Sequence, residues 1–307
     1  MGNLIRKTLY LVRERGARHA FVRVKKYLTY RLKKYFYSKF KFGRLPPVES
    51  FYFETHLVNH CNLDCWGCNH FSPLSDEWYA DPNTFAKDLE RLSELFDKDA
   101  ASISLLGGEP LLHPELERFF PIARKAFPSA AIRIVTNGIL LRKKDEMFWR
   151  ECAAQNIDIA VTVYPDMEKQ FEAAQDKGRS FGVKVYPFNS LETAKTSLHY
   201  PLDLSGGQSP SSNFVKCRQA IAISLREGRL YPCCIRPHLH IFNKYFPAYA
   251  LPDSEKDSID IYAAKSVAEI LDFLSRPIPF CRFCRIDKRS DSNMWQQSKK
   301  DIEEWSL

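Results

Sequence analysis

Residues 51–68 read FYFETHLVNHCNLDCWGC, an apolar stretch that runs directly into three closely spaced cysteines. Short runs rich in Phe, Val and Leu are typical of strands, so residues 51–59 predict a strand. Cys61, Cys65 and Cys68 follow within eight residues. Three thiolates on one tight loop can hold three irons of a four-iron cube and leave the fourth iron open. Zinc is the alternative, although structural zinc sites usually draw cysteine pairs from two separate places.

Short apolar strands and helical stretches alternate beyond this loop. Residues 82–96 predict a helix, because Asp81 can cap it and Pro82 fits its first turn. The other expected strands are 101–106, 131–136, 157–163 and 183–186, and the other expected helices are 114–127, 145–155 and 167–177. Such alternation predicts an α/β fold with a parallel sheet and right-handed crossovers. Because a closed eight-unit barrel needs ~250 residues, we expect an open, partial (β/α)6 barrel over residues 50–200.

The three cysteines of the first loop resemble those of the radical S-adenosylmethionine (SAM) enzymes. Gly107-Gly108-Glu109-Pro110, which follows the next expected strand, is similar to that family's Gly-Gly-Glu-Pro motif. The resemblance implies that the cysteines bind a [4Fe-4S] cluster and that Gly107, Gly108 and Glu109 bind the amino group of SAM. It also implies reductive cleavage of SAM to a 5′-deoxyadenosyl radical, which removes hydrogen from a substrate carbon.

Polar side chains at the next two strand ends are further candidates for contact with SAM. They are Thr136 and Asn137 after the third expected strand, and Thr162 and Tyr164 after the fourth. Asn137-Gly138 is also a common turn sequence, so a simple turn is the alternative there. The residue before the third cysteine is often aromatic in the family, but here it is Gly67, with Trp66 one place earlier. Trp66 is therefore the candidate for the adenine contact.

A second group of cysteines lies in the C-terminal third of the chain. One precedes an expected hairpin of residues 220–225 and 229–231, one follows it, and a pair comes later: Cys217, Cys233, Cys281 and Cys284. The arrangement resembles the twitch form of the SPASM domain, which implies one auxiliary [4Fe-4S] cluster and a small α+β domain over residues 213–290. Cys233 is favoured over its neighbour Cys234 because it occupies the family's Tyr-Pro-Cys position. Zinc is again the alternative.

Two cysteines remain outside both groups. Cys152 falls in an expected helix and is interpreted as a small buried hydrophobic residue. Cys234 is a candidate hydrogen-atom donor to a substrate radical, which would make epimerisation feasible. Without such a donor, the auxiliary cluster would instead accept an electron, and the net reaction would be dehydrogenation.

The chain has a formal net charge of +8, and 14 of its 45 Lys and Arg lie in residues 1–50. Residues 1–45 predict a basic amphipathic helix that either lies on an anionic membrane surface or packs on the rest of the protein. Nucleic acid is not an expected partner, because the other segments add no basic surface. Residues 205–212 predict a flexible connection, and residues 291–307 a C-terminal helix.

The sequence predicts a cytoplasmic radical SAM enzyme, with peripheral contact to the inner membrane face if the basic helix meets lipid. The resemblance to twitch enzymes of similar architecture implies oxidation or epimerisation of a sugar or polyol. This substrate would be linked to a nucleotide or a lipid, or would be a glycan precursor. The resemblance also implies an external electron donor of the flavodoxin or ferredoxin kind. The alternative among enzymes is maturation of a ribosomally made peptide. The alternative of another class is a non-catalytic iron–sulfur electron carrier or a zinc-bound scaffold.

Overall fold

The structure, a computed structural model, describes residues 51–100, 102–188, 196–217 and 219–307 of the 307-residue chain. Residues 50–307 form a single compact unit. The basic helix expected over residues 1–45 lies outside the described residues. Among the described residues, no helix has both the length and the apolarity to span a bilayer.

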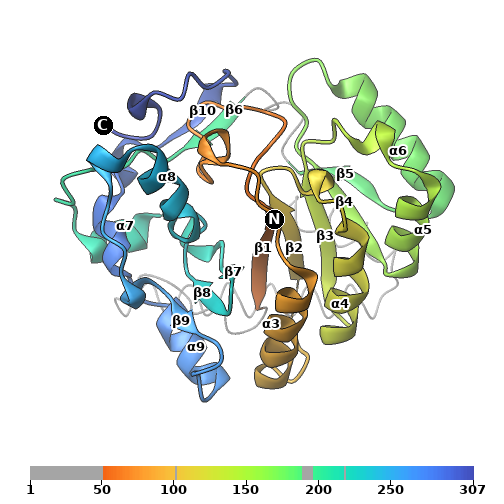
Figure 1. The fold of residues 1–307 in the computed structure, drawn as a ribbon, viewed down its shortest axis with the longest axis horizontal. Coiled ribbons are helices and arrows are strands. Elements are labelled where there is room, and N and C mark those ends of the chain that lie inside the picture. Colours follow the sequence, from red (N-terminus) through yellow and green to blue (C-terminus); the bar gives the residue numbers. More distant parts are fainter. Residues whose placement is uncertain (1–50, 101, 189–195, 218) are drawn as a thin grey trace, which may run out of the picture. The chain divides into compact units, whose positions relative to one another are not determined.

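One sheet of eight strands organises this unit, in the order β5-β4-β3-β2-β1-β7-β8-β9 (Figure 1). Strands β1 to β5 are parallel neighbours, and β7 joins the other edge of β1, also in parallel. The strands are β1 (Tyr52–Val58), β2 (Ser102–Gly107), β3 (Ala131–Thr136), β4 (Ile157–Val161), β5 (Val185–Pro187), β7 (Ser224–Arg226), β8 (Arg229–Tyr231) and β9 (Ile259–Asp260). The expected open, partial barrel is therefore confirmed, but its sixth parallel strand is β7, which lies beyond the residues 50–200 expected for the barrel.

Four helices follow the first four strands and share one apolar core with them. They are α3 (Pro82–Leu95), α4 (Phe119–Ala126), α5 (Glu146–Ala154) and α6 (Glu168–Phe181). Helix α3 begins as expected, because the Asp81 side chain accepts hydrogen bonds from the N–H groups of Asn83 and Thr84. Cys152 of α5 is completely buried in this core, as expected of a small hydrophobic residue.

Strand β1 has two chemically different faces because successive side chains point to opposite sides. Phe53 and Leu57 belong to the core shared with the helices. Glu54 and His56 alternate with them and lie on the other face of the sheet, where both are buried. The face of β1 opposite helices α3 to α6 is thus polar at its centre.

The C-terminal part of the chain continues the sheet and adds a second core. Strands β7, β8 and β9 pair in antiparallel fashion at the edge that begins with β1. Helices α7 (Pro210–Lys216), α8 (Leu239–Tyr245) and α9 (Val267–Leu274) accompany them. The second core also includes Phe71 and Leu74, just beyond the first cysteine loop. The loop is therefore packed against the C-terminal part.

Two expectations about the C-terminal part are wrong. The segment 205–212 is not a free connection, since α7 begins at Pro210 with Ser209 as its cap. Residues 291–307 do not form a helix but contain strand β10 (Ser290–Met294) and a short 3-10 helix, Ile302–Glu304. Strand β10 pairs with β6 (Thr196–His199) in a separate sheet, and this pairing holds the chain extended.

Candidate functional site

The first cysteine loop leaves the carboxyl end of β1 and folds back on itself. Gly67 has a φ of 60°, a left-handed conformation that favours glycine, and the Cys68 N–H donates to the Cys65 carbonyl oxygen at 3.3 Å. The Leu63 N–H donates to Cys61 Sγ at 3.3 Å. All three thiols are free and partly exposed. Burial raises the pKa of the Cys61 and Cys65 thiols, so without a metal both are protonated at neutral pH.

The Gly-Gly-Glu segment at the end of β2 lies directly on the backbone that leads into the cysteine loop. The Gly108 N–H donates to the Val58 carbonyl oxygen at 2.8 Å, and the Glu109 N–H donates to the His60 carbonyl oxygen at 3.1 Å. A Cβ atom on Gly107 would lie 2.4 Å from the Val58 oxygen, and one on Gly108 would lie 2.1 Å from the His60 oxygen. Both glycines are required by this close approach of two strand ends.

Glu109 joins the ends of β2 and β3. Its side chain is completely buried and accepts hydrogen bonds from the Leu111 N–H at 3.0 Å, the Thr136 hydroxyl at 2.6 Å and the Asn137 N–H at 2.8 Å. Burial raises the pKa of Glu109 to about 7, although these hydrogen bonds oppose the shift. The carboxyl group therefore changes its charge near neutral pH.

Asn137 connects the β3 end to the first cysteine loop. Its side-chain NH₂ donates to Asn62 Oδ1 at 2.7 Å and lies 3.8 Å from Cys61 Sγ. The backbone N–H of Thr162, beyond β4, donates to the Thr136 carbonyl oxygen at 2.8 Å. The structure thus brings the strand-end residues expected from the sequence to one edge of the sheet.

Two aromatic side chains approach Cys65. The Cys65 thiol donates to the Tyr164 hydroxyl oxygen at 3.5 Å, and the indole N–H of Trp295 donates to Cys65 Sγ at 3.2 Å. The Tyr164 and Trp295 rings meet edge to face, with centroids 6.2 Å apart. Trp295 was not expected from the sequence, because it falls in a segment interpreted as a helix.

Residues 295–305, which we call the C-terminal strap, lie along the first cysteine loop. Cys65 pairs with Gln297 in an antiparallel bridge, and the Ser298 N–H donates to the Asp64 carbonyl oxygen at 2.8 Å. The indole N–H of Trp305 donates to the Cys68 carbonyl oxygen at 2.8 Å. Residues near both ends of the C-terminal strap therefore contact the first cysteine loop.

Trp66 points toward the C-terminal part of the chain. Its ring packs on His199 with centroids 4.5 Å apart, and the backbone N–H of Trp66 donates to the Gln296 carbonyl oxygen at 2.9 Å. A Cβ atom on Gly67 would lie 2.8 Å from His199 Cδ2 and 3.0 Å from the Glu304 carbonyl oxygen. Because those atoms fill the space beside residue 67, an aromatic side chain there has no room.

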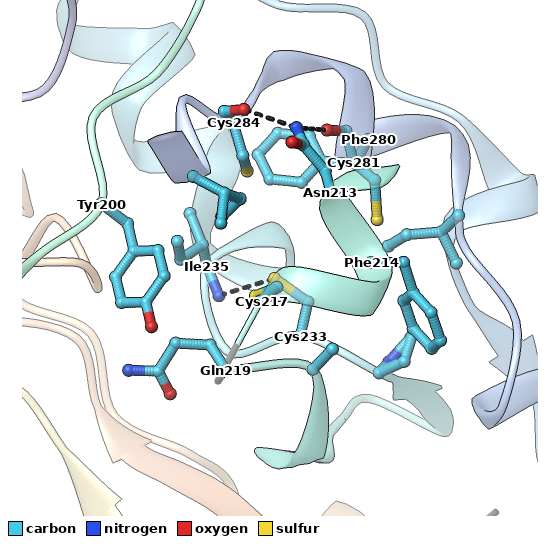
Figure 2. Close-up of a pocket in the computed structure, with 14 residues that line it drawn as sticks. Tyr200, Asn213, Phe214, Cys217, Gln219, Cys233, Ile235, Phe280, Cys281 and Cys284 are labelled. Carbon is cyan, nitrogen blue, oxygen red and sulfur yellow. Dashed lines mark hydrogen bonds between the residues drawn. The ribbon is translucent and has the colours of Figure 1, made fainter. Parts of the chain in front are cut away.

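Four thiols from the C-terminal part line one pocket. Figure 2 shows them around the same hollow: Cys217 at the end of α7, Cys233 after β8, and Cys281 and Cys284 from the segment after α9. The Asn213 side chain donates to the carbonyl oxygens of Cys281 and Cys284, at 2.8 and 2.5 Å. The pocket lining is otherwise mostly apolar.

The adjacent cysteines after β8 face different surroundings. Cys233 lines the four-thiol pocket, and the Ile235 N–H donates to its Sγ at 3.4 Å. Cys234 does not line that pocket and is buried near Glu54 and His70. The two thiols therefore face different surroundings in the structure.

Comparison with known proteins places the fold and the first cysteine loop in a family. Residues 55–184 match the profile of the Radical SAM superfamily. GTP 3′,8-cyclase of Campylobacter fetus subsp. fetus (strain 82-40) is 23% identical over 125 residues, covering 41% of this chain and 38% of the relative. S-adenosyl-L-methionine-dependent 2-deoxy-scyllo-inosamine dehydrogenase of Niallia circulans is 29% identical over 125 residues, covering 40% of this chain and 49% of the relative.

The matched part thus spans less than half the length of these curated relatives. Among solved structures, the crystal structure of BtrN in complex with AdoMet and 2-DOIA is similar, with 19% identity and a TM-score of 0.49. The match covers 77% of this chain and 93% of that one. The profile match by itself identifies a radical SAM domain over residues 55–184, and that family uses a [4Fe-4S] cluster and SAM.

Proposed function

We propose that the protein is a radical SAM oxidoreductase that removes hydrogen from an alcohol-bearing carbon of a sugar or polyol. The observation that carries the proposal is the second pocket, where four thiols from separate segments line one hollow. A fully ligated auxiliary cluster there can accept the electron that an oxidation releases. The similarity to the 2-deoxy-scyllo-inosamine dehydrogenase, although limited to 125 residues, supports a polyol as the substrate class.

The first cysteine loop fits a [4Fe-4S] cluster by its donor set. Cys61, Cys65 and Cys68 would hold three irons, and a fourth iron would remain open for the amino and carboxyl groups of SAM. Such a cluster with SAM supplies one-electron cleavage of the sulfonium and abstraction of hydrogen from carbon. The N–H groups of Leu63 and Trp295 donate to the cysteine sulfurs and would stabilise the charge on them.

The strand ends beside the loop would hold SAM. Gly107 and Gly108 let the end of β2 lie directly against the backbone that leads into the cysteine loop, and Glu109 would accept from an N–H of the SAM amino group. Thr136 and Asn137 orient the Glu109 carboxylate through their hydrogen bonds. We assign Thr162, Tyr164 and Trp66 to the outer wall of this site, with Trp66 turned toward His199.

The direct test is production of 5′-deoxyadenosine by the full chain after anaerobic reconstitution, with SAM and a strong reductant. Supplied with aminocyclitols or nucleotide sugars, the enzyme is expected to form a ketone and one 5′-deoxyadenosine for each turnover. Solvent deuterium separates the two branches, because only epimerisation returns a hydrogen to the reacting carbon. Absence of 5′-deoxyadenosine from protein with intact clusters would overturn the proposal.

Iron content is expected to distinguish the two adjacent cysteines after β8. Cys233→Ala should lower iron and acid-labile sulfide by about half, because a thiol of the four-thiol pocket is lost. Cys234→Ala should leave both unchanged, since this thiol lies outside the pocket. Iron and sulfide assays on anaerobically reconstituted protein measure the difference. The reverse pattern would show that Cys234 is the ligand.

The Trp295→Phe variant is expected to lower the reduction potential of the first cluster. Hydrogen bonds to cluster sulfurs stabilise the more negative, reduced state of the cluster. Removal of the indole N–H should therefore lower the reduction potential by on the order of tens of millivolts. Redox titration monitored by electron paramagnetic resonance measures the shift. Trp305→Phe is the matched control, because its N–H donates to a carbonyl oxygen instead of a sulfur. Equal shifts in the two variants would contradict the assignment.

SAM affinity is expected to increase with pH in the range where Glu109 ionises. The pKa of Glu109 is raised to about 7, so the carboxylate that accepts from the SAM amino group is mostly protonated near pH 6. Between about pH 6 and pH 8 the affinity should rise roughly tenfold. Equilibrium dialysis under anaerobic conditions measures this slope. The Glu109→Gln variant should show no such slope, whatever its absolute affinity.

A further inference from the structure

A third group of metal-binding side chains lies outside both cysteine sets assigned above. Glu54 comes from β1, His70 from the segment just after the first cysteine loop, and Cys234 from the turn after β8. One ligand atom of each lies within 4.8 Å of the others. Three segments far apart in sequence thus place a carboxylate, an imidazole and a thiol together.

Glu54 is a buried carboxyl group whose pKa is raised by burial, while hydrogen bonds from Tyr52 and Ser224 and the charge of Arg133 oppose the shift. Only 6% of the residue is exposed, and its oxygens accept from the Tyr52 hydroxyl at 2.9 Å and the Ser224 hydroxyl at 3.2 Å. Among the described residues, no Lys, Arg or His forms an ion pair with it. Because an ionised carboxylate is costly to bury without a cation, this position favours a positively charged ligand.

Two further histidines surround the group with unused nitrogen atoms. The His56 ring lies 4.4 Å from that of His70 and 3.8 Å from that of His238, between ring centroids. Neither nitrogen of His56 has a hydrogen-bond partner in the described part of the chain, and Nε2 of His238 has none either. Both residues are at least nine-tenths buried. Buried polar groups are normally satisfied, so these nitrogens indicate a missing ligand.

The histidines also lie beside the charged side chain of Arg226. The guanidinium of Arg226 is itself engaged by Nδ1 of His238 at 3.1 Å and by Asn59 at 3.2 Å.

We propose that Glu54, His70 and Cys234 bind one divalent transition-metal ion of the zinc class, with a solvent molecule as the fourth ligand. One thiolate, one imidazole and one carboxylate match the preferences of such borderline ions. Calcium and magnesium are not expected, because they prefer an all-oxygen shell. The ion would lie on the polar face of β1, on the side of the sheet opposite helices α3 to α6.

Zinc is the probe for the test, because X-ray absorption at the zinc edge does not detect iron. Full-length protein with both iron–sulfur clusters is expected to bind one zinc per chain, with one sulfur at ~2.3 Å and three nitrogen or oxygen atoms at ~2.0–2.1 Å. Cys234→Ser and His70→Gln should each weaken zinc binding by at least about tenfold. Iron and sulfide content reports whether each variant is folded and loaded.

Cys152→Ser is the matched control, because it alters an equally buried thiol in α5, outside the proposed site. It should bind zinc as the unaltered protein does. Three results would overturn the proposal: no zinc bound while both clusters are intact, a shell of four sulfurs, or zinc binding that Cys234→Ser leaves unchanged. The result is independent of the proposed reaction, which 5′-deoxyadenosine formation tests separately.

Discussion

Replacement of Cys65 by Ala is expected to reduce 5′-deoxyadenosine formation to background and to lower bound iron by about half. Two thiols cannot hold three irons, and Cys65 is also the sulfur to which Trp295 donates its N–H. The remaining residues of the SAM site would stay in place, so the loss arises from the cluster alone. Chromatography of the products after anaerobic incubation with SAM and reductant measures the activity.

The control for this variant is Cys152→Ala, which removes a free thiol from the core shared by α5 and the sheet. It should retain iron and most of the activity, at some cost in stability. Full activity in the Cys65→Ala protein would show that this loop does not hold the catalytic cluster. A zinc ion bound by the loop in place of iron would lead to the same conclusion.

Gly108→Ala is the second substitution with a large expected effect. The new Cβ atom would lie 2.1 Å from the His60 carbonyl oxygen and 2.6 Å from that of Asn59. These are backbone atoms and cannot rotate away, so the ends of β1 and β2 must separate. Overpacking of this kind costs ~1–3 kcal/mol, which corresponds to a roughly 10- to 100-fold loss of SAM affinity if the strain falls on the bound state.

Gly207→Ala is the matched control for this substitution, because the nearest atom to its added Cβ is the Ser205 hydroxyl oxygen at 3.4 Å. That contact is tolerable, and SAM affinity should not change. Isothermal titration of the reconstituted proteins with SAM provides the comparison. If Gly108→Ala binds SAM normally, the Gly-Gly-Glu segment has no part in the cofactor site.

The barrel could be predicted from sequence because its signals are local. Strand β3 has the expected bounds, residues 131–136, and α3 ends within one residue of the expected position. Capping residues and apolar periodicity act over a few neighbours, so one sequence is enough to reveal them. The expected helix over 114–127 begins only at Phe119, after a 3-10 turn at Leu116–Arg118.

The candidate site was predictable where a spaced motif marks it. Its outer contacts were not, because they depend on segments far apart in the chain. The bond from Trp295 to Cys65 spans 230 residues, and the sequence around Trp295 gives no local sign of it. The group of Glu54, His70 and Cys234 was missed for the same reason, since no spacing in the sequence connects these residues.

The pairing of β7 with β1 has a consequence for electron transfer. Strand β1 leads into the loop with Cys61, and β7 leads through β8 to Cys233. Cys61 and Cys233 therefore follow strands of one hydrogen-bonded sheet. The sheet, and not a flexible linker, would hold the two proposed redox centres in one fixed arrangement. An electron would cross the same gap in every copy of the protein.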